Sequence, residues 1–187
     1  MKNDLHLMID AAAFAADKHR FQRRKGAGRG AKAIPYINHP LEVALILANE
    51  GGVSDPITLA AALLHDTVED TRTSPGELIE RFGVEIAEVV MELTDDKSLP
   101  KFMRKELQVI NAPHKSLRAT LVKTADKICN LRDLVKSPPN WTTERKQDYL
   151  EWSKEVVGAL PLKNQRLKNA FNRSASNAQQ TFAKDVD

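Results

Sequence analysis

The chain has 187 residues, of which 42% are hydrophobic and 28% charged, and a formal net charge of +3 at pH 7. This length suits one globular domain, or at most two small ones, and no apolar run approaches the ~20 residues needed to span a bilayer. The modest charge does not by itself indicate nucleic-acid binding, and the single cysteine, Cys129, excludes an internal disulfide, so the reducing cytoplasm is the expected compartment.

Helical periodicity runs through nearly the whole chain, and no segment alternates convincingly as a strand would. Helices are expected over residues 4–23, 38–52, 56–70, 75–83, 84–94, 101–110, 116–135, 142–158 and 163–187. Glycines in 23–36 and the sequence SPPN at 137–140 mark loops between them. The fold class is therefore expected to be all-α, in a single domain with a core over about 4–160 and a polar helical tail over 163–187, frayed near its end.

Capping residues precede several of these helices. Asn38 and Thr142 are expected N-caps, and Asp55 is followed by a proline at the first helical position. Ser74 and Glu77 have the spacing of a capping box, in which each side chain bonds the other residue's backbone N–H.

The sequence HDTVED at 65–70 ends an apolar run with four ionisable groups. In one continuous helix, His65 and Glu69 share a face, and Asp66 and Asp70 share the adjacent face. Charged groups at the end of a buried segment are costly unless a partner compensates them. An imidazole beside a carboxylate suits a divalent cation, and Glu69 and Asp70 remain for acid–base chemistry.

Two other predicted helices supply further candidate ligands. His39 stands near the start of one helix, and Asp126 lies in a polar stripe with Lys123 and Asn130 on the otherwise apolar 116–135 helix. Each residue alone is more often structural, as a cap, a core histidine or a surface pair, but the combination predicts a metal site. Two imidazoles and two carboxylates leave room for water in an octahedral shell, which favours Mn²⁺ or Fe²⁺ over tetrahedral zinc. The four predicted ligands are His39, His65, Asp66 and Asp126.

A basic segment precedes His39 and comprises Arg20, Arg23, Arg24, Lys25, Arg29 and Lys32. The usual interpretation of such a run is a solvated surface. The functional interpretation is a phosphate clamp, because guanidinium groups bind phosphate oxygens bidentately. No aromatic residue interleaves the run, which disfavours single-stranded nucleic acid. Arg145 and Tyr149, one helical turn apart, are candidates for a second phosphate or sugar contact.

The chain closely resembles the HD-domain hydrolases of guanosine tetra- and pentaphosphate, in particular the stand-alone small alarmone hydrolases that include a metazoan type. The resemblance covers most of the chain in order. The matching stretches are RRK (23–25), PYINHP (35–40), AALLHDTVEDT (61–71), FG (82–83), TDDK (94–97), LVKTADKICNLRDL (121–134) and DYLEW (148–152).

The resemblance implies a compact HD-domain helical bundle with one Mn²⁺ per chain, bound by the four ligands predicted above. It implies that Glu69 and Asp70 position and activate the attacking water. The residues implied to contact the nucleotide are Arg24, Lys25, Asn130, Arg145 and Tyr149. The larger relatives continue into synthetase and regulatory domains, so only hydrolysis is expected of a chain of this length.

The activity implied is removal of the 3′-diphosphate of ppGpp or pppGpp, yielding GDP or GTP and pyrophosphate and ending stringent-response signalling. The expected partner is thus a small nucleotide, with no nucleic acid and no membrane. One alternative is the same metal chemistry on (p)ppApp or on the 2′-phosphate of NADPH. Another is a catalytically silent alarmone-binding protein, and a nucleic-acid module ranks third.

Overall fold

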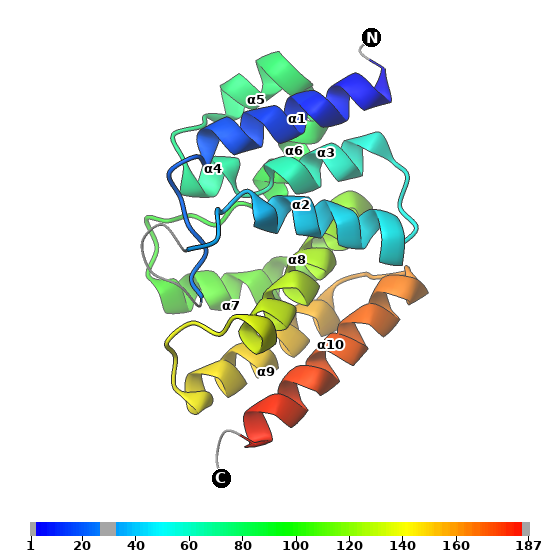
Figure 1. The fold of residues 1–187 in the computed structure, drawn as a ribbon. Helices are drawn as coiled ribbons and strands as arrows, with labels where there is room; N and C mark the ends of the chain where they lie inside the picture. Colours follow the sequence, from blue (N-terminus) through cyan, green and yellow to red (C-terminus); the bar gives the residue numbers. More distant parts are fainter. Residues whose placement is uncertain (1–2, 27–32, 185–187) are drawn as a thin grey trace.

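The computed structural model describes residues 3–26 and 33–184, and these residues form a helical bundle (Figure 1). The helices are α1 (Asp4–Lys18), α2 (Asn38–Leu45), α3 (Pro56–Leu64), α4 (Thr67–Asp70), α5 (Pro75–Phe82), α6 (Val84–Leu93), α7 (Lys101–Asn111), α8 (Leu117–Lys136), α9 (Thr143–Ala159) and α10 (Gln165–Lys184), with a π-helical turn η2 (Ile46–Glu50) and a 3₁₀ turn η3 (Ala112–His114). Over the described ranges, β structure is limited to one isolated bridge, Arg23–Pro35. The predicted all-α class is confirmed.

The central element is α8, which packs against α2, α3, α6, α9 and α10 (Figure 1). Its first turn is capped by Ser116, whose side chain accepts a hydrogen bond from the backbone N–H of Ala119. Helix α8 is buried on nearly all sides, and even the polar residues Lys123 and Asp126 are largely shielded from solvent. The polar groups near the middle of α8 are therefore enclosed by neighbouring parts of the chain.

Three of the four predicted caps form. The side chains of Asp55, Ser74 and Thr142 each accept a hydrogen bond from the backbone N–H three residues later. Asn38 is instead the first residue of α2, and no side-chain cap precedes it. In the predicted capping box, Oε1 of Glu77 forms an ion pair with Nζ of Lys18 in α1, at a distance of 2.7 Å.

Two helices end earlier than predicted. Helix α1 stops at Lys18 rather than residue 23, because the chain after His19 turns into the segment that bridges Arg23 to Pro35. The predicted 56–70 helix is broken after Leu64. There the hydroxyl of Thr67 donates to the Leu64 carbonyl at 2.7 Å, so a side chain takes an acceptor that a continuing helix would use.

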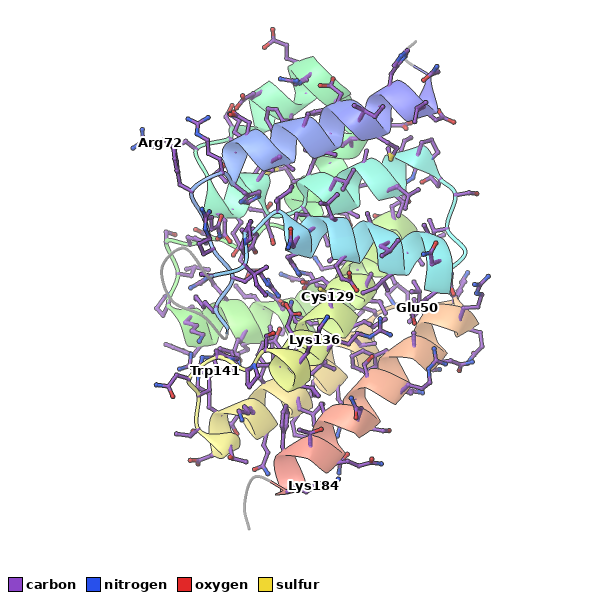
Figure 2. The ribbon with its side chains drawn as sticks, viewed as in Figure 1. Glu50, Arg72, Cys129, Lys136, Trp141 and Lys184 are labelled. Atoms are coloured by element: carbon purple, nitrogen blue, oxygen red, sulfur yellow. The ribbon has the colours of Figure 1, made fainter. Side chains whose placement is uncertain are left out.

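Helix α10 is part of the core. The Asn164 side chain accepts from the backbone N–H of Leu167 at 3.0 Å, and α10 then packs along α8 and α9. It buries Leu167, Phe171 and Phe182 in the same cluster as the α8 side chains, so the core extends beyond residue 160. In Figure 2, Glu50 lies where η2 approaches α8 and α10. Residues 185–187 of the predicted tail lie outside the described residues.

Within residues 3–26 and 33–184, no helix combines the length and the apolar character needed to cross a membrane.

Candidate functional site

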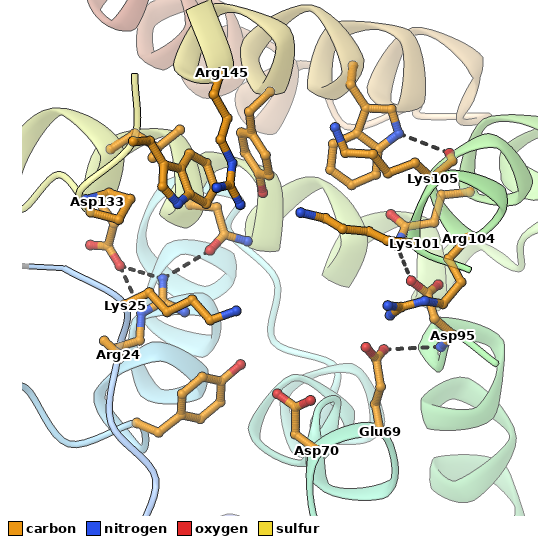
Figure 3. Close-up of a pocket in the computed structure, with 18 of the residues that line it drawn as sticks. Arg24, Lys25, Glu69, Asp70, Asp95, Lys101, Arg104, Lys105, Asp133 and Arg145 are labelled. Atoms are coloured by element: carbon orange, nitrogen blue, oxygen red, sulfur yellow. Dashed lines mark hydrogen bonds and ion pairs between the residues drawn. The ribbon is translucent and has the colours of Figure 1, made fainter. Parts of the chain in front are cut away.

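A cavity of about 610 Å³ opens between the segment around residues 22–25, helix α4, helix α7 and helix α9. The residues predicted to act in catalysis or to contact the nucleotide all line it. They are Arg24, Lys25, Glu69, Asp70, Asn130, Arg145 and Tyr149. Figure 3 shows Arg24 and Lys25 on one side, Lys101 and Arg104 on the other, and Glu69 between them at the base. The structure thus brings together groups that are up to 125 residues apart, as from Arg24 to Tyr149.

The cavity is rich in cations that lack a carboxylate partner. Lys101, Arg104 and Arg145 line it, and none of them forms an ion pair within the part of the chain that the structure describes. The Nε atom of Arg104 is buried without a hydrogen-bond partner there. Burial, and then the neighbouring charges of Arg145 and Lys105, lower the pKa of Lys101. Such an excess of cations in a concave site favours a polyanionic ligand.

Helix α7 supplies cations that the sequence argument missed. Lys101, Arg104 and Lys105 follow one another at helical i, i+3 and i+4 spacing, so they share one face. In the sequence, the high charge of this helix was the one feature that could have indicated its role. In the structure, the helix buries no residue. Such a helix either faces solvent or forms the wall of a polar site.

Aromatic rings form the α9 side of the cavity. Tyr149 lies between Trp141 and Trp152, with ring centroids 5.8 and 5.3 Å from its own. The guanidinium of Arg145 lies 4.2 Å from the centroid of Trp141, and Lys105 lies 4.7 Å from that of Trp152. These cation–π contacts hold the long basic side chains in place.

The members of the basic segment have different positions. Arg23, Arg24 and Lys25 line the cavity, whereas Arg20 pairs with Asp17 on the surface. Arg29 and Lys32, which are also part of the predicted phosphate clamp, lie outside the described residues.

Glu69 and Asp70 differ in how fully their oxygens are engaged. Both oxygens of Asp70 have partners, since Lys97 donates to Oδ1 and Gln22 donates to Oδ2 at 3.1 Å. Oε2 of Glu69 accepts from the backbone N–H of Asp95 at 3.1 Å, while the one charged partner of Oε1 among the described residues is Lys97, at 3.9 Å. Burial raises the pKa of Glu69, and nearby carboxylates add to this rise. Glu69 is therefore the carboxylate better placed to accept a proton.

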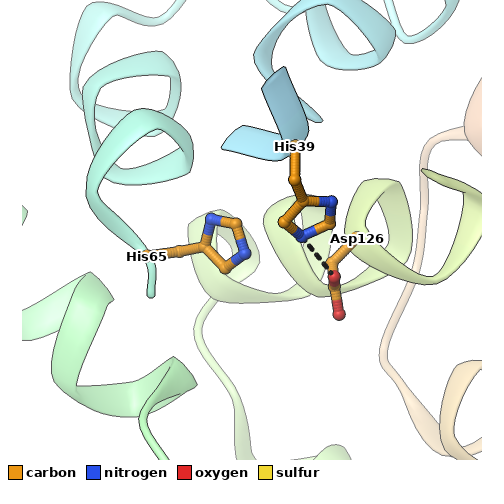
Figure 4. Close-up of side chains that lie close together, drawn as sticks. All are labelled: His39, His65 and Asp126. Carbon is orange, nitrogen blue, oxygen red and sulfur yellow. Dashed lines mark ion pairs between the residues drawn. The ribbon is translucent and has the colours of Figure 1, made fainter. Parts of the chain in front are cut away.

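Beneath the cavity, three of the predicted metal ligands converge (Figure 4). One ligand atom from each of His39, His65 and Asp126 lies within 4.8 Å of the other two. They come from α2, from the break between α3 and α4, and from α8. Nε2 of His39 is 3.2 Å from Oδ1 of Asp126. Because α3 is broken at His65, the imidazole reaches this point from a turn and not from a continuous helix face.

The fourth predicted ligand, Asp66, is at the same place. Its Oδ2 lies 3.0 Å from Nε2 of His65 and 3.6 Å from Nε2 of His39, and it accepts a 2.6 Å hydrogen bond from the Tyr36 hydroxyl. Tyr36 also lines the cavity, as does Asn130, which bonds Asp126. The four ligands thus lie just below residues that face the cavity.

The residues fit a divalent cation. Nδ1 of His65 donates to the Ala62 carbonyl at 2.8 Å, and Nδ1 of His39 lies 3.3 Å from Sγ of Cys129, so both rings turn Nε2 toward the common point. Nε2 of His65 is buried and lacks an aligned hydrogen bond within the described chain, although Asp66 approaches it. Two imidazole nitrogens and two carboxylates are a ligand set suited to Mn²⁺, Fe²⁺ or a similar cation.

The pKa values of His65 and Asp66 indicate that the site attracts positive charge. Burial lowers the pKa of His65, but the carboxylate of Asp66 outweighs it and raises that pKa to about 9. Burial likewise raises the pKa of Asp66, and the imidazole of His65 more than reverses it. The acidic pair Asp66 and Asp126 therefore draws positive charge to the point where the ligand atoms meet.

The chain is similar to known proteins over most of its length. The HD domain family matches residues 11–151. The chain is 52% identical over 161 residues to guanosine-3′,5′-bis(diphosphate) 3′-pyrophosphohydrolase MESH1 of Xenopus tropicalis, covering 86% of this chain and 88% of that protein. It is 50% identical over 172 residues to the Homo sapiens MESH1, covering 91% and 94%.

A solved structure described as a metazoan ortholog of SpoT that hydrolyzes ppGpp and plays a role in starvation responses has the same fold. It superposes with a TM-score of 0.86 at 42% identity and covers 91% of this chain and 94% of its own.

Proposed function

The chain belongs to the HD domain family, as a member of the group of MESH1 pyrophosphohydrolases, and we propose that it hydrolyses ppGpp and pppGpp at the ribose 3′ position. Water attacks the phosphorus next to the 3′-oxygen, the P–O3′ bond breaks, and the products are GDP or GTP and pyrophosphate. The observation that carries this proposal is the position of His39, His65, Asp126 and the adjacent Asp66 beside a cavity whose cations Lys101, Arg104 and Arg145 form no ion pair among the described residues.

We propose that His39, His65, Asp66 and Asp126 hold one Mn²⁺ ion. Their donor set supports this choice, because two nitrogens and two carboxylates leave coordination positions open in an octahedral shell. The ion would supply Lewis-acid activation of water and would neutralise charge that develops on the phosphorus.

Glu69 is proposed as the general base and Asp70 as the residue that orients the water. The looser engagement of the Glu69 Oε1 atom supports this division, as does the pKa of Glu69, which burial raises. Both oxygens of Asp70 accept hydrogen bonds, which fix the carboxylate in place. Asp70 is therefore better suited to orienting the water than to accepting its proton.

Arg24, Lys25, Asn130, Arg145 and Tyr149 are proposed to hold the nucleotide. Their position in one cavity supports this role. Because phosphoryl transfer depends mainly on positioning and on electrostatic stabilisation, these residues act by fixing the remaining phosphates and the sugar. The single thiol of Cys129 is consistent with the proposed cytoplasmic location.

The test is product analysis after incubation with ppGpp and Mn²⁺. Release of pyrophosphate together with GDP supports the proposal. Parallel assays with ppApp and NADPH, on the same preparation, measure the competing substrates. Binding of ppGpp without any pyrophosphate release at saturating Mn²⁺ would instead indicate an alarmone-binding protein.

A further inference from the structure

Arg24 connects the segment after α1 to helix α8. Its backbone N–H donates to the Ile34 carbonyl at 2.9 Å, which fixes the start of the side chain beside the 23–35 bridge. The guanidinium then reaches α8, where Nε donates to Oδ2 of Asp133 at 3.1 Å and Nη2 donates to the same oxygen. Nη2 also donates to Oδ1 of Asn130 at 2.9 Å.

Asn130 continues this connection to the metal centre. Its Nδ2 donates to Oδ1 of Asp126 at 2.6 Å, and that same oxygen lies 3.2 Å from Nε2 of His39. Asp126, Asn130 and Asp133 occupy positions i, i+4 and i+7 of α8, so they follow one face of the helix. A continuous hydrogen-bonded chain therefore runs from Asp133 through Arg24 and Asn130 to Asp126.

The direction of each bond in this chain is determined by chemistry. A guanidinium only donates hydrogen bonds, so the Asn130 atom that faces Arg24 must be the acceptor, Oδ1. The amide then has to present its NH₂ group to Asp126. If Arg24 were not held there, the amide oxygen would lose its donor and the Asn130 side chain would no longer be fixed in the rotamer that presents its NH₂ group to Asp126.

Asp133 is the group that holds Arg24. It takes two of the guanidinium's donors on a single carboxylate oxygen, and its negative charge compensates the charge of a side chain that is only 16% exposed. Among the described residues, Arg24 forms its ion pair with Asp133. Without that carboxylate, a largely buried cation would lack compensation and would shift toward another anion.

We propose that Asp133 is a positioning residue of the metal centre: by clamping Arg24 it fixes the amide of Asn130, which in turn orients the Asp126 carboxylate toward the imidazoles. This inference extends the proposed function to one more residue of the same site. Groups that bond a metal ligand typically change metal affinity or activity by about 10–100-fold when they are removed.

The primary measurement is Mn²⁺ binding to the protein without nucleotide, by calorimetry or by the spectroscopic signal of free Mn²⁺. Asp133→Ala is expected to weaken Mn²⁺ binding by about 10-fold. Asp17→Ala is the matched control, because Asp17 also pairs with an arginine, Arg20, but on the exposed surface of α1. The control is expected to bind Mn²⁺ as the unmodified protein does.

A double-substitution cycle tests the chain of contacts itself. If Asp133 acts through Asn130, the double variant Asn130→Ala/Asp133→Ala should bind Mn²⁺ about as weakly as Asn130→Ala alone. Fully additive losses would overturn the proposal. So would unchanged Mn²⁺ affinity in Asp133→Ala combined with a raised KM, because that result would assign Asp133 to substrate contact alone.

Activity gives a second readout. At saturating Mn²⁺ the kcat of Asp133→Ala should approach that of the unmodified protein, whereas a kcat defect that extra Mn²⁺ does not correct contradicts the inference. Asp133→Asn, which keeps the shape of the side chain, repeats the test if the alanine variant is unstable by thermal melting. Because Mn²⁺ binding is measured without nucleotide, it remains informative even if ppGpp proves not to be the substrate.

Discussion

The hydroxyl of Tyr36 donates a 2.6 Å hydrogen bond to Oδ2 of Asp66, and this bond joins the cavity to the metal centre below it. Tyr36→Phe removes the donor but keeps the ring, which packs 4.8 Å from His19 and 5.7 Å from His39 between centroids. We expect Mn²⁺ affinity to fall by about 10-fold while the melting temperature changes little. Mn²⁺ titration and thermal melting test this, and an unchanged affinity would show that Asp66 is oriented without Tyr36.

Removal of the metal should remove activity reversibly. Chelation with EDTA is expected to abolish ppGpp hydrolysis, and added Mn²⁺ should restore it. Asp66→Ala should lose Mn²⁺ binding and turnover together, because it deletes a proposed ligand that lies 3.0 Å from the His65 Nε2 atom. Full activity in EDTA, or full activity of Asp66→Ala, would contradict a metal-dependent reaction.

Measurements of kcat and of Mn²⁺ binding should distinguish the roles of Glu69 and Asp70 from those of the metal ligands. Glu69→Gln keeps the size of the side chain but cannot accept a proton as a carboxylate does, so we expect kcat to fall by about 10²–10⁴-fold with Mn²⁺ binding retained. Asp70→Asn should lower kcat less, since its role is to orient water. A near-normal kcat in Glu69→Gln would remove it from the role of general base.

The sequence predicted most helices from local patterns, whereas the residues of the proposed site came from short motifs together with the resemblance to the HD-domain hydrolases. Helical periodicity, and the caps at Asp55, Ser74 and Thr142, depend on short spacings that a sequence displays directly. The break after Leu64 depends on a side-chain bond from Thr67 that competes with the helix, which periodicity does not reveal. For this reason the predicted continuous helix through the HDTVED segment was wrong, although the residues themselves gather at the site.

Contacts between distant segments were not visible in the sequence. The clamp between Arg24 and Asp133 joins residues 109 positions apart, and only the packing of α8 against the first helices brings them together. The cations of α7 were missed for a related reason, since a charged helix such as 101–110 looks like a solvated surface until the cavity beside it is known.

Arg145 offers a test of the cavity that leaves the metal centre untouched. Its guanidinium stacks on Trp141 and has no ion pair among the described residues, so it is available for a phosphate. Arg145→Ala is expected to raise the KM for ppGpp by about 10–100-fold, the loss of one charge-assisted hydrogen bond. Mn²⁺ affinity should stay unchanged, and steady-state kinetics with a Mn²⁺ titration measure both. An unchanged KM would exclude Arg145 from substrate binding.

The ion pair between Glu50 and Arg132 predicts how stability depends on pH. Arg132 of α8 donates to both oxygens of Glu50 at the end of η2, and Arg173 of α10 adds a longer contact of 3.6 Å. The hydrogen bond from Arg132 lowers the pKa of Glu50, an effect that burial partly opposes. A carboxyl group whose pKa is lower in the folded state stabilises that state above its unfolded pKa, and this contribution is lost as the pH falls through the folded value.

Glu50→Gln should therefore destabilise the protein at pH 7 by about 1–3 kcal/mol, since it weakens a bidentate charge-assisted pair. For a chain of this size each kcal/mol corresponds to a change in Tm of about 2–4 °C. The difference between the two proteins should shrink at acidic pH, where Glu50 is protonated in both folded and unfolded states. Glu151→Gln is a suitable control, because its partner Lys154 lies on the same exposed face of α9. Thermal melts at several pH values measure the effect, and a difference in Tm that stays constant down to strongly acidic pH would contradict the electrostatic explanation.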